Sequence, residues 1–133
     1  MKQTVLVIAA HPDDEVLGCG GTMARHSAEG DEVHVLILAE GATSRDKTRN
    51  RDAKEQELSE LAQAAQKAGD VLGISSLRLH HFPDNRMDGV ELLDVIKVVE
   101  EHLQRVRPEV VYTHHIGDLN VDHQKTHKAV ITA

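Results

Sequence analysis

The chain of 133 residues is poor in cysteine, in aromatic residues and in long apolar runs. Its single cysteine, Cys19, excludes an internal disulfide framework and is compatible with a reducing compartment, so we expect a cytoplasmic protein. No apolar run approaches the roughly 20 residues that a membrane-spanning helix needs. The opening residues do not resemble a secretory leader, so we expect neither a membrane span nor a signal peptide.

The chain also lacks an excess of basic residues. It has 15 Lys and Arg against 22 Asp and Glu, a net charge of −7, which argues against a nucleic-acid partner because such binding depends on clustered cations. With 40% hydrophobic and 28% charged residues the composition is globular, and the length fits one domain over residues 1–133. Ten histidines, against one Tyr, one Phe and no Trp, are the unusual feature that remains.

The first apolar stretch, from Thr4 to Ala10, is rich in Val, Leu and Ile and is typical of a strand buried on both faces. It is followed by the run His11-Pro12-Asp13-Asp14-Glu15, which no apolar core requires. Ligands of parallel α/β sheets bind at the carboxyl ends of strands, so this turn is the first candidate site. Asp13 or Asp14 could simply cap the helix that follows, but capping does not account for the whole run.

Strand-like and helix-like segments alternate along the whole chain. The sequence predicts strands over 4–10, 33–39, 76–82 and 109–113, and helices over about 15–29, 55–72, 92–106 and from Gln124 onward. The first helix is expected to turn Val16, Met23 and Ala24 inward. The alternation implies an α/β fold in three layers, a parallel sheet with helices on both faces. Right-handed crossovers give the strand order 3-2-1-4 if the winding reverses after the third strand.

A second polar run, from His114 to His123, follows the fourth predicted strand. In the order 3-2-1-4 this run lies beside the turn after the first strand, because strands one and four are then neighbours. The two runs together supply histidines and carboxylates. Catalytic zinc commonly takes three nitrogen or oxygen ligands and keeps one position for water, so two histidines and one aspartate would suit such a site.

Three segments carry a resemblance to a known family: His11-Pro12-Asp13-Asp14-Glu15, Gly18-Cys19-Gly20-Gly21 and the later pair Asp122-His123. They resemble the LmbE-like, or PIG-L, family of zinc-dependent deacetylases, and the resemblance covers nearly the whole chain. It implies a Rossmann-like fold and hydrolysis of the acetyl group of an N-acetylglucosamine-type conjugate. The expected partner is therefore a small-molecule amino-sugar conjugate.

The resemblance also implies roles for individual residues. Zinc would be held by His11, Asp14 and His123, although the same ligands would suit Fe²⁺. Asp13 would be the general base that takes the proton of the water and passes it to the departing amine. Asp122 would orient a histidine, and we expect it to be a catalytic residue as well.

One residue departs from the family pattern. Asn120 stands where the family often has a histidine that stabilises the oxyanion or protonates the leaving amine. An amide donates a hydrogen bond but supplies no proton. His114 or His115 is therefore the candidate replacement for that histidine, and of the two we expect His115 to be a catalytic residue. Asp84, Asp118 and Asn120 are candidate sugar contacts, with plain turn chemistry an equal alternative for Asp84.

Members of the family generally continue well past the length of this chain. We therefore expect an incomplete domain with an unpaired sheet edge, which binds zinc, deacetylates weakly and tends to form homo-oligomers. The main prediction is a zinc-dependent hydrolase that deacetylates an N-acetylated amino sugar. Two alternatives stay open: a hydrolase of another amide, and a non-catalytic zinc- or sugar-binding remnant of the fold.

Overall fold

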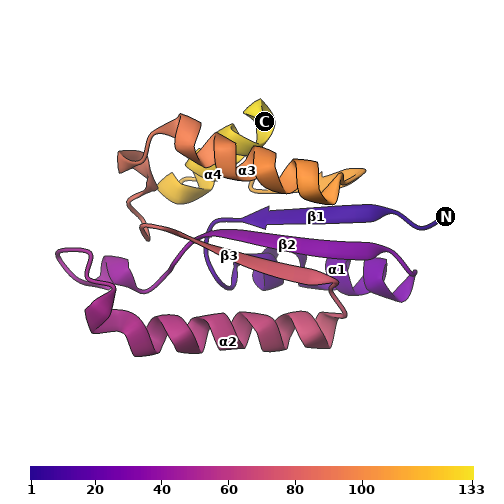
Figure 1. Cartoon of the computed structure of the whole chain (residues 1–133), viewed down its shortest axis with the longest axis horizontal. Coiled ribbons are helices and arrows are strands. Elements are labelled where there is room, and N and C mark those ends of the chain that lie inside the picture. Colours follow the sequence, from indigo (N-terminus) through magenta and orange to yellow (C-terminus); the bar gives the residue numbers. More distant parts are fainter.

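The computed structural model describes all 133 residues and shows one parallel sheet between two layers of helices (Figure 1). The strands are β1 (Thr4–Ala9), β2 (Glu32–Ala39), β3 (Ser76–Phe82) and β4 (Val110–Tyr112). The helices are α1 (Asp14–Ala28), α2 (Glu55–Leu72), α3 (Leu92–Val106) and α4 (Val121–Thr132), with short 3-10 turns η1 (Thr43–Arg45), η2 (Asp52–Lys54) and η3 (Met87–Gly89). The strand order is β3-β2-β1-β4 and every pair is parallel, which confirms the predicted α/β fold.

Two apolar clusters fill the spaces between the sheet and its helices. In β1, Leu6 and Ile8 pack in the cluster that contains residues of α3 and α4, whereas Val5 and Val7 pack in the cluster with residues of α1 and α2. Figure 1 shows the same division, with α3 and α4 above the sheet and α1 and α2 below it. Each of these four side chains is at most 2% exposed, as expected of a strand covered on both faces. None of the helices is long and apolar enough to cross a membrane.

The start of α4 differs from the prediction. The helix begins at Val121 rather than at Gln124, because Asn120 serves as its N-cap. The side-chain oxygen of Asn120 accepts the backbone N–H of Asp122 at 2.9 Å and that of His123 at 3.3 Å. The capping bonds place both of these residues in the first turn of the helix, where their orientation is fixed.

The inward face of α1 is also rotated relative to the prediction. Met23 is buried, as predicted, and Ala24 is half-buried. Val16, however, is 37% exposed, whereas the preceding residue, Glu15, is only 4% exposed. The prediction for Val16 is therefore wrong, because the first turn of the helix buries a carboxylate in place of an apolar side chain.

The carboxyl ends of β1 and β4 open at the same edge of the sheet. The two strands are parallel neighbours, with Val5 opposite Val110 and Val7 opposite Tyr112. The loop after β1 and the loop after β4 therefore meet, although they are far apart in the sequence. Since all four strands are parallel, the loops after β2 and β3 lie at this edge as well.

Candidate metal centre

Three side chains converge where the loop after β1 meets the start of α4. Asp14 Oδ2 lies 3.1 Å from His11 Nδ1 and 2.9 Å from His123 Nε2. We call His11, Asp14 and His123 the ligand cluster; the three side chains are only 14–16% exposed. One possible ligand atom from each lies within 4.8 Å of the others, so the structure brings together the three predicted zinc ligands.

The far nitrogen of each histidine in the ligand cluster is bound by a second carboxylate. His11 Nε2 lies 2.7 Å from Asp122 Oδ2, and His123 Nδ1 lies 2.7 Å from Asp118 Oδ2. A carboxylate accepts an N–H at this position, so when the ring is neutral, as metal binding requires, its other nitrogen is the one that faces Asp14. Metal-binding histidines are typically oriented in this way.

The ligand cluster brings His11 Nδ1, His123 Nε2 and Asp14 Oδ2 together in a largely buried site. Without a metal, a protonated His11 faces the Asp14 carboxylate, and a bound cation would take the place of that proton. Burial by itself lowers the pKa of His11, but the hydrogen bonds to Asp122 and Asp14 outweigh burial and raise the pKa to about 10. Burial would raise the pKa of Asp14, but its bonds to His11 lower the pKa to about 2. Two imidazole nitrogens and one carboxylate oxygen are a donor set that fits Zn²⁺ or Fe²⁺.

Asp122 is held from three directions. It is 0% exposed, and besides His11 it accepts the backbone N–H of Asn85 at 2.6 Å and that of Met87 at 2.9 Å. The loop after β3 therefore fixes the carboxylate that fixes His11. Because Asp122 has no access to solvent, it acts on the ligand cluster through His11 alone.

The candidate sugar contacts are engaged in the same network. Asp84 is 5% exposed, accepts the backbone N–H of Ser44 at 3.0 Å and lies 3.4 Å from His11 Nε2. Besides capping α4, Asn120 donates its side-chain N–H to Asn85 Oδ1 at 3.0 Å. These bonds join the loops after β2, β3 and β4 around the ligand cluster.

Asp13 occupies the N-cap position of α1, but its side chain makes no capping hydrogen bond. Its backbone has φ 137° and ψ −28°, a conformation that costs a residue with a side chain about 1–3 kcal/mol. Burial and the neighbouring charge of Asp14 raise the pKa of Asp13 above its usual value. The simple capping role is therefore wrong for Asp13, an exposed residue whose carboxyl group interacts with the neighbouring Asp14.

The two consecutive histidines after β4 have different environments. His114 Nε2 accepts the backbone N–H of Ala10 at 2.9 Å, and its ring stacks on His123 with centroids 3.8 Å apart. Burial and the adjacent His123 lower the pKa of His114 to about 4, so this ring is neutral at pH 7. His115 is exposed, and its Nδ1 accepts the backbone N–H of Gly117 at 3.0 Å. The structure thus places His114, rather than His115, against the ligand cluster.

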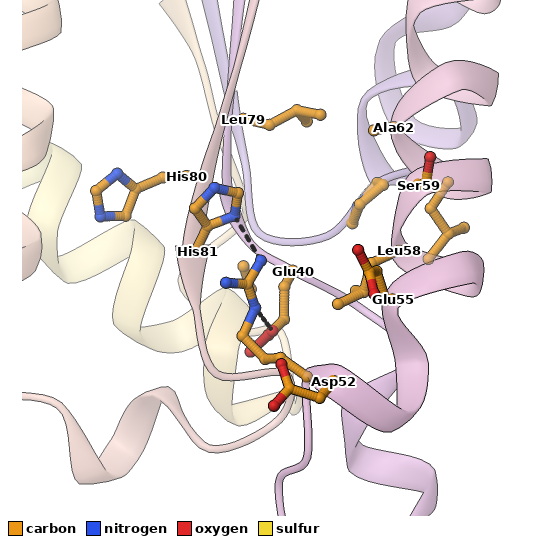
Figure 2. A pocket seen from close by; sticks show the side chains of 13 residues that line it. Glu40, Asp52, Glu55, Leu58, Ser59, Ala62, Leu79, His80 and His81 are labelled. Carbon is orange, nitrogen blue, oxygen red and sulfur yellow. Dashed lines mark hydrogen bonds and ion pairs between the residues drawn. The ribbon is translucent and has the colours of Figure 1, made fainter.

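Two cavities are relevant to ligand binding. One of about 230 Å³ adjoins the ligand cluster, and its lining includes Asp14, Glu15, Cys19, Tyr112, His114 and His115. A second, of about 390 Å³, lies between α2 and β3 and is lined by no residue of the ligand cluster (Figure 2). Its central carboxylate, Glu40, already pairs with Arg51 Nε at 2.8 Å, and Arg51 also reaches His81. The smaller cavity is therefore the one associated with the candidate chemistry.

Comparison with known proteins identifies the family of this chain. The model of the PIG-L family, described as GlcNAc-PI de-N-acetylase, matches residues 6–133. The chain belongs to the PIG-L family. The resemblance inferred from the three sequence segments is confirmed, and two of those segments are the ones that form the ligand cluster.

Three relatives show how similar this PIG-L chain is to known proteins and how much of their length it covers. The protein named uncharacterized deacetylase YaiS from Escherichia coli is 27% identical over 137 residues, covering 99% of this chain and 68% of YaiS. The probable N-acetyl-α-D-glucosaminyl L-malate deacetylase 2 of Bacillus cereus is 27% identical over 135 residues, 100% of this chain and 61% of that protein. The crystal structure of GalB, the 4-carboxy-2-hydroxymuconate hydratase of Pseudomonas putida, matches with TM-score 0.76 and 26% identity over 99% of this chain and 55% of GalB. The chain thus spans between 55% and 68% of the length of these relatives.

Proposed function

We propose that this chain carries the metal centre of a zinc-dependent deacetylase that acts on an N-acetylglucosamine-type conjugate. The observation that carries the proposal is the orientation of the two histidines of the ligand cluster. Asp122 and Asp118 each bind the far nitrogen of one ring, at 2.7 Å, and the other nitrogen of each ring faces Asp14. The family description and the names of two relatives, both deacetylases, support the reaction class.

In this proposal His11 Nδ1, Asp14 and His123 Nε2 hold the metal. Zinc in such a site acts as a Lewis acid, which polarises an amide carbonyl and lowers the pKa of water. Asp118 and Asp122 are positioning residues, because each acts through a histidine. We assign Asp122 this role in place of direct catalysis, since it is fully buried.

Asp13 is the proposed general base. It is an exposed residue whose carboxylate is not used as a cap, so it is free to accept the proton of the attacking water. The same carboxyl group then gives that proton to the nitrogen as the amide C–N bond breaks. The balanced products are acetate and a free amine. His115, on the lining of the adjacent cavity, stays a predicted catalytic residue, and the engaged Asp84 and Asn120 are proposed to order the loops rather than to bind sugar.

A hydratase is the second candidate, because GalB shares the fold with 26% identity over nearly the whole of this chain. A metal centre with a nearby base also serves the addition of water to an activated carbon–carbon double bond. The two reactions have different products. Deacetylation releases acetate, whereas hydration of an unsaturated acid releases nothing.

The test combines zinc content with acetate release from N-acetylglucosamine conjugates. The purified chain should bind about one zinc ion, His123→Ala should lose most of it, and the control variant His102→Ala, outside the cluster, should keep it. Asp13→Asn should keep zinc but lose acetate release by a factor of about 10²–10⁴. Full zinc occupancy in His123→Ala would refute the metal site, and full acetate release by Asp13→Asn would refute the assigned base.

A further inference from the structure

At the N-terminus of α1, the side chain that binds a backbone N–H is not that of the N-cap residue. The residue at the N-cap position, Asp13, makes no side-chain cap bond. The carboxylate of Glu15 instead accepts the backbone N–H of Asp13 at 2.7 Å. Glu15 is 4% exposed, so this bond is shielded from water, and no role in metal binding or proton transfer has been assigned to it.

The Glu15 carboxylate accepts the N–H that immediately precedes the helix. Burial raises the pKa of this carboxyl group, and its hydrogen bond to the Asp13 N–H opposes the rise. In an ordinary N-cap, the side chain at the position of Asp13 accepts an N–H from the second or third residue of the helix. Here the N–H of the third helical residue, Val16, is bonded to the Asp13 carbonyl oxygen at 3.0 Å, and the Asp13 side chain makes no cap bond.

The backbone of Asp13 is held at both of its polar groups. Its N–H is bound by Glu15, and its carbonyl oxygen accepts the N–H groups of Val16 at 3.0 Å and Leu17 at 2.9 Å. Between these bonds φ is 137°, a value that side-chain-bearing residues rarely adopt. A strained conformation persists only where its surroundings impose it. The bond to Glu15 is the hydrogen bond of the Asp13 N–H itself, and the same turn is closed by the Asp14 N–H, which bonds His11 O at 3.1 Å.

We infer that Glu15 is a positioning residue, which holds the backbone of Asp13 so that the Asp13 carboxylate is not used as a helix cap and can act as a base. The inference rests on the proposed function, because it assigns Asp13 the proton transfer. Without an acceptor at position 15, Asp13 would relax from its positive φ and turn its own carboxylate onto the helix N-terminus. The metal ligands would be left in place, since none of them contacts Glu15 through a hydrogen bond.

The kinetic test uses zinc-loaded Glu15→Ala and Glu15→Gln. In Glu15→Ala, kcat for acetate release should fall by about 10–100-fold, while KM changes by less than about twofold, because the base is misdirected but the metal site is intact. Glu15→Gln should recover most of kcat, since its amide oxygen can accept the same N–H. The matched control is Asn50→Ala, which removes a side chain that accepts the Ala53 N–H at 3.1 Å on an exposed turn and should leave kcat unchanged.

A structural test needs no activity. In a crystal structure of zinc-loaded Glu15→Ala, Asp13 should have left the region near φ +137° and its carboxylate should bond a backbone N–H of the first turn. If Glu15→Ala does not fold, Glu15→Met, which keeps the volume without an acceptor, takes its place in both tests. Zinc content near one per chain is expected in every variant.

Two results would overturn the inference. One is a Glu15→Ala structure in which Asp13 keeps both its backbone conformation and its free carboxylate. The other is a loss of zinc in proportion to the loss of kcat, which would mean that Glu15 supports the ligand cluster as a whole. If the wild-type chain releases no acetate, the proposed function fails, but the structural test still decides whether Glu15 controls Asp13.

Discussion

Replacing Asp122 with asparagine tests how the metal centre is held. Asp122 Oδ2 accepts bonds from His11 Nε2 at 2.7 Å and from the Asn85 N–H at 2.6 Å, and Oδ1 accepts the Met87 N–H at 2.9 Å. An asparagine has one oxygen and one NH₂ group of nearly the same shape. Whichever way it turns, the NH₂ group faces at least one buried backbone N–H, so two donors meet and one bond is lost.

The size of the effect follows from these contacts. A buried N–H without a partner costs about 1–3 kcal/mol, and losing the charge assistance of the bond to His11 adds about 1 kcal/mol. Asp122→Asn should therefore lower the free energy of unfolding of the metal-free protein by about 2–4 kcal/mol. The tautomer of His11 is also no longer dictated by a carboxylate, so zinc affinity should fall by about 10–100-fold.

Asp118→Asn is the matched control. Asp118 plays the same part for His123 through one bond at 2.7 Å, but its side chain is 33% exposed, so water can replace what is lost. Zinc affinity should again fall, whereas the free energy of unfolding should change by less than about 1 kcal/mol. Urea unfolding of the metal-free proteins measures the free energy of unfolding, and competition with a chelator measures zinc affinity. Equal unfolding free energies for Asp122→Asn and the wild type would show that Asp122 does not hold the loop after β3.

Three further predictions concern stability. Asn120→Ala removes the cap of α4 and should lower the free energy of unfolding by about 1 kcal/mol, measured by urea unfolding, with Asn120→Asp as the variant that keeps the cap. Glu40→Ala removes the buried partner of Arg49 and Arg51 and should cost about 1–3 kcal/mol in the same assay; a neutral result would mean that this network is formed only loosely. In the metal-free protein, the pKa of His11 is raised from 6.5 to about 10, so its stabilisation is complete below pH 6.5 and is lost as pH rises through 10. The pKa of Asp14 is lowered from 3.8 to about 2, so its stabilisation is present above pH 3.8 and is lost as pH falls through 2, and thermal unfolding should place maximum stability between these limits.

Most of the fold could be predicted from local patterns in the sequence. Continuous runs of β-branched residues predict strands covered on both faces, and apolar stripes predict helices, because each depends only on which residues within a few positions are apolar. The order 3-2-1-4 needed one further rule, the handedness of crossovers, and the structure confirms it. Local patterns were less informative at helix ends: the start of α4 depends on the capping bonds of Asn120, and the inward face of α1 depends on the burial of Glu15.

By itself the sequence determined the fold, the family and the residue types available for a metal, because motifs and periodicity are properties of neighbouring residues. Only the tertiary structure decided how those residues are paired. Asp118 was expected to contact sugar but binds His123, and Asp122 binds His11 from the other side of the site. Which carboxylate meets which ring nitrogen depends on the packing of loops from four strands, and a hydrogen bond is specified to a few tenths of an ångström. No spacing along the chain carries that information, which is why the roles of the carboxylates had to be read from the folded molecule.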